Sequence, residues 1–238
     1  MHMGSPAAAF LERHTIFPLG LTMPYSLRYV IFDLDDTLYP RGSGVMEEVL
    51  RLILRYMTQR LGMDSEEASA LRRRYLVEYG TTTAGLLRHQ CIDPDDYLAY
   101  VHDIPVQRYL RANAELDCVL DTIPLSKAIW TNGTRAHAER VLMALGIRRH
   151  FSPILDIRDM GYLSKPAPEL YPRLLEMLGA EGPECILVED SMRNLRPAQP
   201  LDMITVLVDG DNGADVDFVI PRVEEIGSVL QTLQRTSR

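Results

Sequence analysis

The sequence predicts an α/β fold in which a mainly parallel sheet lies between layers of helices and an all-helical domain is inserted after the first strand. Apolar runs typical of buried strands alternate with helical segments at residues 29–32 and again from residue 126 onward. Such alternation indicates a parallel sheet covered on both faces. Between residue 44 and about residue 120, no convincing strand pattern interrupts the helical texture. The length of 238 residues fits a core plus a smaller insert.

The insert is predicted to be helical because apolar residues recur every three or four positions. In the segment 45–61 the apolar positions are Met46, Val49, Leu50, Ile53, Met57 and Leu61. Further helices are predicted at 64–79, 82–89, 94–101 and 106–111, separated at several points by Gly or Pro. This helical insert should form a domain of its own.

The remaining elements are expected to build the core. Strands are predicted at 29–32, 127–131, 154–157, 185–189, 203–208 and 218–220, and helices at 135–145, 168–178 and 222–233. We therefore expect a Rossmann-like three-layer α/β/α core from residues 25–40 and 121–238, a helical domain from residues 41–120, and an N-terminal extension at residues 1–24.

Composition excludes several classes of function. The net charge of -8 disfavours a surface for nucleic acid polymers. The cysteines Cys91, Cys118 and Cys185 have neither the spacing of a zinc site nor that of a disulfide framework. No apolar run approaches the roughly 20 residues that span a bilayer, and the N-terminal residues do not suit a secretory signal. We expect a cytoplasmic protein that binds no nucleic acid polymer and no membrane.

The first strand ends in crowded carboxylates. Asp33, Asp35 and Asp36 lie within four positions, and like charges that close raise one another's pKa unless a cation compensates. Ligands of open α/β sheets bind beyond the carboxyl ends of the strands, so a divalent metal is the first hypothesis. The alternative is a polar turn, since Asp and Thr favour turns and helix N-caps.

Polar residues follow later strands in a matching way. Thr131 and Asn132 come after the second strand, where a hydroxyl and backbone N–H groups before a helix can hold an anion. Glu189 and Asp190 follow a later apolar run, and Lys165 lies in the preceding segment, in Ser164-Lys165-Pro166-Ala167-Pro168. Together these residues favour a metal and phosphate site over a set of ordinary turns.

The same residues resemble the four sequence motifs of the haloacid dehalogenase-like hydrolase superfamily. The motifs are Asp33-x-Asp35-x-Thr37, Thr131, Lys165 and Glu189-Asp190. The helical insert falls where that superfamily carries its type-one cap. The resemblance covers nearly the whole chain after Arg28.

The resemblance implies a role for each motif residue. Asp33 would be the nucleophile that forms an aspartyl-phosphate, and Asp35 the general acid and base. Thr131, Asn132 and Lys165 would hold the phosphoryl group. The Mg²⁺ ligands would be Asp33, the backbone carbonyl of Asp35, and Asp190, with Glu189 binding directly or through water.

Within this superfamily, Asp35 favours phosphate chemistry over dehalogenation, and Thr37 favours a phosphatase over a β-type phosphomutase. Local segments around residues 33–44, 79–86 and 96–103 resemble the pyrimidine 5′-nucleotidase group. The substrates would then be UMP, CMP or their deoxy forms. Residues that would read the substrate are Tyr39, Tyr79, Thr81, Thr82 and His102.

Two alternatives stay open at this point. One is another small-metabolite phosphatase of the same fold, acting on sugar phosphates or phosphoglycolate. The other is a non-catalytic protein that binds a phosphorylated metabolite, although such a protein would not need the second aspartate, Asp35.

Overall fold

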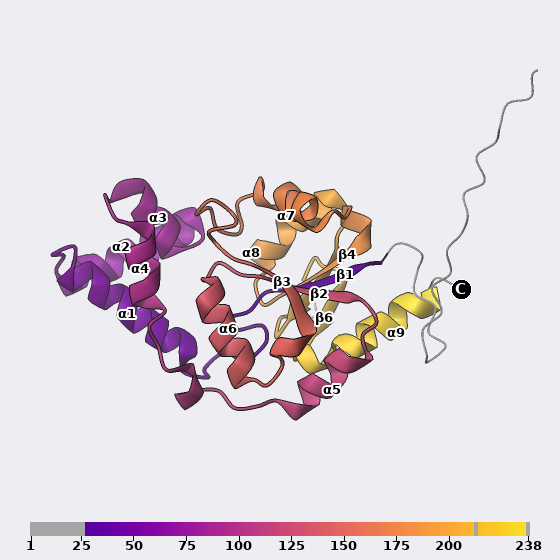
Figure 1. Ribbon diagram of the computed structural model, residues 1–238. Coiled ribbons are helices and arrows are strands. Elements are labelled where there is room, and N and C mark those ends of the chain that lie inside the picture. The colour runs from indigo at the N-terminus through magenta and orange to yellow at the C-terminus, as the bar shows by residue number, and fades with distance from the viewer. Residues whose placement is uncertain (1–26, 212–213, 237–238) are drawn as a thin grey trace, which may run out of the picture.

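A parallel six-stranded sheet forms the centre of the molecule (Figure 1). The computed structural model describes residues 27–211 and 214–236, so the expected N-terminal extension at residues 1–24 lies outside the described residues. The strands are β1 (Tyr29–Phe32), β2 (Ser126–Trp130), β3 (Phe151–Leu155), β4 (Cys185–Glu189), β5 (Ile204–Val208) and β6 (Phe218–Ile220). Their order is β3-β2-β1-β4-β5-β6, and each neighbouring pair is parallel. The predicted Rossmann-like sheet is confirmed.

Helices cover both faces of this sheet. They are α5 (Ala114–Thr122), α6 (Arg135–Ala144) and α9 (Ile226–Thr236) on one face, and α7 (Leu170–Leu178) and α8 (Met192–Leu195) on the other (Figure 1). Successive residues of a strand point to opposite faces. Accordingly, Val30 and Phe32 pack in the core with α5, α6 and α9, whereas Ile31 packs in the core with α7 and α8.

The insert contains four helices, α1 (Val45–Gln59), α2 (Ser65–Tyr79), α3 (Thr82–His89) and α4 (Pro94–Val101), grouped at one end of the molecule (Figure 1). Each of α2, α3 and α4 begins at a side-chain cap. Asp64, Thr81 and Asp93 accept hydrogen bonds from backbone N–H groups of the first turn. These caps explain why the predicted starts of the three helices are correct to within a residue.

Some predicted elements differ from the observed ones. The third strand begins at Phe151, three residues before the predicted start, and runs through Pro153. Proline lacks the N–H that a central strand needs, but β3 lies at the edge of the sheet, where it is tolerated. The helix predicted at 106–111 is a single 3₁₀ turn, Val106–Arg108, and the closing helix starts at Ile226 after another such turn.

Helix α5 was not predicted, and it starts within the range 41–120 that the sequence assigns to the insert and ends at Thr122. It packs against α9 in the core, and Glu115 forms an ion pair with Arg222. Just before α5, Asn113 donates a hydrogen bond to Glu224 over 2.7 Å. We therefore propose that the helical domain ends before Ala114.

The insert contacts the core directly above the carboxyl ends of the strands. Arg193 of α8 donates to the carbonyl oxygens of Leu76 (2.6 Å) and Val77 (2.7 Å) at the end of α2. The residues that follow α2 also contact the core closely. A Cβ on Gly80 would lie 2.5 Å from Pro166 Cδ, and the Thr81 hydroxyl lies 2.9 Å from the Ser164 hydroxyl. The end of α2 is thus fixed beside the loop that carries Lys165.

The two connections between core and insert also meet. Gly44 precedes α1 with φ +99°, and a Cβ there would lie 2.6 Å from Cδ1 of Tyr109, which follows the insert's helices. Only glycine allows both the backbone conformation and this close approach.

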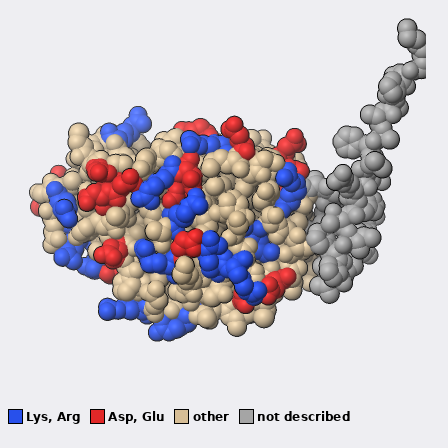
Figure 2. Space-filling view, viewed as in Figure 1, with Lys and Arg blue, Asp and Glu red and all other residues tan. Residues whose placement is uncertain are grey.

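Two further features are the distribution of charge on the surface and the length and apolarity of the helices. Lysine and arginine are interspersed with aspartate and glutamate on the face shown in Figure 2. Within residues 27–211 and 214–236, every helix falls short of the length and apolarity needed to cross a membrane.

Candidate active site

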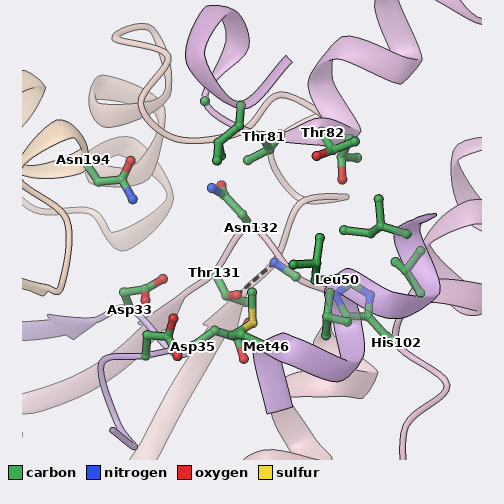
Figure 3. Close-up of a pocket in the computed structure, with 18 of the residues that line it drawn as sticks. Asp33, Asp35, Met46, Leu50, Thr81, Thr82, His102, Thr131, Asn132 and Asn194 are labelled. Atoms are coloured by element: carbon green, nitrogen blue, oxygen red, sulfur yellow. Dashed lines mark hydrogen bonds between the residues drawn. The ribbon is translucent and has the colours of Figure 1, made fainter. Parts of the chain in front are cut away.

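A cavity lies between the carboxyl ends of three strands and the insert (Figure 3). Its volume is about 430 Å³. From the core, Asp33 follows β1, Thr131 follows β2 and Asp190 follows β4, and all three line it. From the insert, residues of α1, α2 and α3 form the opposite wall. The strand-end residues that the sequence singled out are therefore brought together.

Lys165 is a buried cation shared by two carboxylates. Its ammonium group donates to Asp33 Oδ1 (2.7 Å), Glu189 Oε1 (2.7 Å) and the Trp130 carbonyl oxygen (2.9 Å), which satisfies all three of its hydrogens. Its exposed fraction is 1%. Burial lowers the pKa of Lys165, but the charges of Asp33 and Glu189 outweigh burial and raise it. The lysine therefore stays charged.

The carboxylates around Lys165 carry more negative charge than it can balance. Burial raises the pKa of Asp33, and the charges of Glu189 and Asp190 add to this while Lys165 opposes it. Burial likewise raises the pKa of Glu189. Oxygen atoms of Asp33, Glu189 and Asp190 lie within 4.8 Å of one another. Three clustered carboxylates against one ammonium group suit a divalent cation with oxygen ligands.

Asp190 and Glu189 differ in how many of their oxygens are already bonded. Glu189 accepts from Lys165 and Asn194 at Oε1 (both 2.7 Å) and from the backbone N–H of Ser191 at Oε2 (3.1 Å). Asp190 accepts from Arg41 at Oδ2 (2.5 Å), while its Oδ1 lies 3.5 Å from the Thr37 hydroxyl. Oδ1 of Asp190 is therefore more available to a cation than either oxygen of Glu189.

Asp35 is held by two donors at one oxygen. The Tyr39 hydroxyl donates to Oδ1 over 2.6 Å, and His137 Nε2 lies 2.8 Å from the same atom. No donor from the described residues bonds Oδ2. Burial raises the pKa of Asp35, but the charge and hydrogen bond of His137, with the bond from Tyr39, outweigh it and lower the pKa to about 2. The carboxyl group is therefore fixed at Oδ1 and free at Oδ2.

His137 is fully buried in the first turn of α6 and stacks on His102, with ring centroids 4.7 Å apart. Its Nδ1 has no hydrogen-bond partner among the described residues. Nε2 is the ring nitrogen that donates its hydrogen to Asp35, because the Asp35 carboxylate accepts there. Burial, with the neighbouring His137, lowers the pKa of His102 to about 3, so His102 is neutral.

Thr131 and Asn132 occupy the turn between β2 and α6. The Thr131 hydroxyl accepts the Gly133 N–H over 2.9 Å, the bond drawn in Figure 3. Asn132 bonds the loop of Lys165 twice, accepting from the Lys165 N–H (2.7 Å) and donating to the Lys165 carbonyl oxygen (3.2 Å). Asn132 therefore positions Lys165 as well as lining the cavity.

The residues predicted to read the substrate fall into two groups. Thr81, Thr82 and His102 line the cavity (Figure 3). Tyr39 does not: it is buried, and its hydroxyl is bonded to Asp35. Tyr79 does not line it either, because its hydroxyl turns to Glu78 and His89, each at 2.6 Å. Tyr39 and Tyr79 therefore lie outside the lining of this cavity.

With this geometry established, the comparisons with known proteins become informative. The sequence profile of the haloacid dehalogenase-like hydrolases matches residues 27–202. The chain belongs to this family. The resemblance inferred from Asp33-x-Asp35-x-Thr37 and the later strand ends is confirmed.

Relatives of this haloacid dehalogenase-like hydrolase include two named for phosphate chemistry. Phosphate metabolism protein 8 of Saccharomyces cerevisiae is 27% identical over 78% of this chain, and the match spans only 63% of the yeast protein. Glyceraldehyde 3-phosphate phosphatase of Methanopyrus kandleri is 27% identical over 88% of this chain and 99% of its own. Among solved structures, the magnesium-bound hydrolase YfnB of Bacillus subtilis superposes with a TM-score of 0.54 at 19% identity, covering 86% of this chain and 99% of that one. This structural match supports the fold.

Sequence reasoning missed three parts of the hydrolase's site. Arg41 contacts Asp190 across a separation of 149 residues, and His137 contacts Asp35 across 102. Neither residue belongs to a recognisable short motif. The third part is the cavity wall from α1, which includes Met46, Leu50 and Ile53. Its helical spacing was visible in the sequence, but spacing alone does not distinguish a face turned to the core from one turned to a cavity.

Proposed function

We propose that this chain is a Mg²⁺-dependent phosphomonoester hydrolase that works through an aspartyl-phosphate and takes pyrimidine nucleoside monophosphates such as UMP and CMP. The observation that carries the proposal is the pair Asp33 and Asp35 at the end of β1. One carboxylate is bonded to Lys165, and the other is fixed with a free oxygen in the same cavity. That arrangement provides a nucleophile and an acid on one loop.

The donor set fits Mg²⁺, because the buried carboxylates exceed the positive charge available to them. Asp33, Asp190 and the backbone carbonyl of Asp35 would hold the ion. Glu189, whose oxygens are already bonded, would support Lys165 and act on the ion through water. When bound, Mg²⁺ neutralises charge on the phosphoryl oxygens.

In the first half-reaction, a carboxylate oxygen of Asp33 attacks phosphorus and forms an O–P bond. The bond from phosphorus to the leaving oxygen breaks, and that oxygen keeps the electron pair and takes a proton from Oδ2 of Asp35. The pKa of Asp35 is about 2 without substrate, so this step needs the negative charge of the bound phosphate, which raises that pKa and favours the protonated carboxyl group. Lys165, bonded to Asp33 at 2.7 Å, reduces the repulsion between carboxylate and phosphate. Thr131 and Asn132 hold the transferring group.

In the second half-reaction, water attacks the phosphorus of the aspartyl-phosphate. Asp35, now a carboxylate, takes the proton from that water at Oδ2. The O–P bond to Asp33 breaks, which releases inorganic phosphate and restores the Asp33 carboxylate. Because Tyr39 and His137 both bind Oδ1, the same oxygen of Asp35 serves both half-reactions.

The cavity supports a nucleotide-sized leaving group. Beyond the carboxylates it is lined by apolar residues of α1 and by the hydroxyl-bearing residues Thr81, Thr82 and Thr83. An apolar wall suits the face of a ring, and hydroxyls suit its polar edge. The local resemblance to pyrimidine 5′-nucleotidases supports the same substrate class.

A second candidate is a phosphatase of short sugar or triose phosphates. The relative from Methanopyrus kandleri, named glyceraldehyde 3-phosphate phosphatase, favours it and matches over 88% of this chain. The two candidates share every step of the chemistry and differ in the leaving group.

The test is a screen of phosphate release with Mg²⁺ over UMP, CMP, AMP, ribose 5-phosphate and glyceraldehyde 3-phosphate. We expect UMP and CMP to give the highest kcat/KM. Equal or higher values for glyceraldehyde 3-phosphate would select the second candidate. The variant Asp33→Asn should lose phosphate release by a factor of about 10³ or more while keeping its melting temperature. Undiminished turnover by that variant would reject the aspartyl-phosphate route.

A further inference from the structure

We infer that Arg72 is the residue that recognises the leaving group, by donating hydrogen bonds to carbonyl oxygens of its ring. This inference rests on the proposed function and deepens it, because it assigns a residue to the selection of a pyrimidine base. Arg72 belongs to α2, and no sequence motif singled it out.

The position of Arg72 places it away from the reacting carboxylates. Arg72 and Leu76 both line the cavity and lie one helical turn apart, about 6 Å along the axis of α2. The end of α2 beyond Leu76 is the one bonded to the core through Arg193 and packed on Pro166. Arg72 therefore lies one helical turn farther from that junction than Leu76 does.

The guanidinium group of Arg72 is available. It is half-buried, yet it makes no hydrogen bond or ion pair with any residue in the part of the chain that the structure describes. Other arginines around the site are engaged: Arg41 binds Asp190, and Arg193 binds two carbonyl oxygens of α2. A guanidinium carries five N–H donors in a fixed plane, so an unpaired one in a cavity favours a ligand with acceptor oxygens.

The charged residues that line the cavity are mostly acidic. Four aspartates line it, namely Asp33, Asp35, Asp36 and Asp190, and Arg72 is the only lysine or arginine among the described residues that line it. The aspartates surround the place where phosphate and cation meet. The single positive charge is then free to act on the other end of the substrate.

Met46, Leu50 and Ile53 of α1 line the same cavity and offer an apolar wall. A flat ring that packs on this wall and turns an oxygen toward Arg72 would contact both the apolar side chains and the guanidinium group. Uracil and cytosine carry ring carbonyls, whereas adenine has none, and ribose 5-phosphate has no ring base at all. The chemistry of the wall and the arginine thus selects a carbonyl-bearing base.

The experiment replaces Arg72 by Met, which keeps the apolar stem, and by Lys, which keeps the charge without the planar fork. Arg73→Met is the matched control, since Arg73 is exposed, unpaired within the described residues and outside the cavity. We expect Arg72→Met to lower kcat/KM for UMP about 10- to 100-fold, chiefly through KM. Hydrolysis of ribose 5-phosphate should change less than about twofold, and Arg72→Lys should recover only part of the loss.

Binding measured without turnover separates this inference from the proposed function. In an Asp33→Asn background, calorimetry with UMP and with ribose 5-phosphate should show the same selective loss for Arg72→Met. An unchanged affinity for UMP, or an equal loss for both ligands, would overturn the role of Arg72 whether or not the enzyme hydrolyses UMP. Absence of phosphate release from every ester by the unmutated protein, with selective UMP binding retained, would instead reject the proposed function.

Discussion

At the scale of single residues, the side chain of Asp35 shows how geometry assigns a chemical role. Tyr39 and His137 both contact Oδ1, so the rotation of the carboxyl group is fixed and Oδ2 is left without a hydrogen bond from any described residue. His137 could not be predicted as a partner of Asp35, because the two are 102 residues apart and His137 lies in an ordinary amphipathic helix. By contrast, Asp33, Asp35 and Lys165 were predictable, since the two aspartates directly follow a buried strand and Lys165 directly precedes Pro166 in a proline-rich segment.

We predict that His137→Phe lowers kcat about 10- to 100-fold and moves the acid limb of the pH profile to higher pH. Phenylalanine can still stack on His102, but it cannot donate to Asp35. Since His137 is what lowers the pKa of Asp35, its removal raises that pKa, and the base form needed for the second half-reaction is lost at a higher pH. Steady-state rates across the acid range measure the shift.

His102→Phe is the control for this prediction, because it leaves both hydrogen bonds to Asp35 in place. A profile for His137→Phe that coincides with that of the unmutated enzyme would show that His137 does not act on Asp35.

At the scale of elements, α2 joins the insert to the catalytic loops. Its last turn accepts two hydrogen bonds from Arg193, and the following residues contact Ser164 and Pro166, on either side of Lys165. The helices of the insert were predictable from periodicity and from their caps, Asp64, Thr81 and Asp93. Helix α5 was missed because only Leu116 and Leu120 are buried in it, and a single such pair gives little periodicity.

Arg193→Met should raise KM about 5- to 30-fold for all substrates and change kcat less. The two hydrogen bonds hold the end of α2 over the cavity, so their loss favours conformations in which the insert is not positioned for binding. Arg196→Met is the matched control, because Arg196 is exposed on the same side of the fold and makes no hydrogen bond or ion pair within the described residues.

Hydrogen exchange at the end of α2 would show whether the effect is local. Faster exchange there in Arg193→Met alone would support the prediction, whereas equal KM values for the two variants would contradict it.

At the scale of the whole molecule, the parallel sheet determines where charge accumulates. Strands β1, β2 and β4 all end at the same edge, which brings Asp33, Thr131 and Asp190 together although they are distant in the chain. This convergence was predictable, because it follows from strand direction. The wall from the insert was not, since the orientation of a separate helical domain depends on contacts such as Arg193 with Leu76 that sequence patterns do not record.

We predict that added Mg²⁺ stabilises the protein more at about pH 8 than at about pH 5. The pKa values of Asp33 and Glu189 are raised on folding. Without metal, the folded state therefore binds more protons than the unfolded state above about pH 4, and the free energy of unfolding falls as pH rises. A bound cation compensates the ionised carboxylates and removes this loss.

Urea denaturation with and without Mg²⁺ at both pH values measures the difference. At one free metal concentration, set to 100 times the dissociation constant at about pH 8, the gain should be about 2.7 kcal/mol at that pH and smaller at about pH 5. Asp190→Asn should reduce it, and an equal gain at both pH values would contradict the assignment of the ligands.

The contact between Gly44 and Tyr109 has a mechanical consequence. The chain leaves the core and returns to it at one point, where a Cβ on Gly44 would overlap the tyrosine ring. The insert is therefore joined to the core covalently at one place and by non-covalent contacts at the end of α2. Opening the cavity for substrate exchange would break contacts of the second kind and would leave the pairing of the strands unchanged, while a larger residue at position 44 would force the two covalent connections apart.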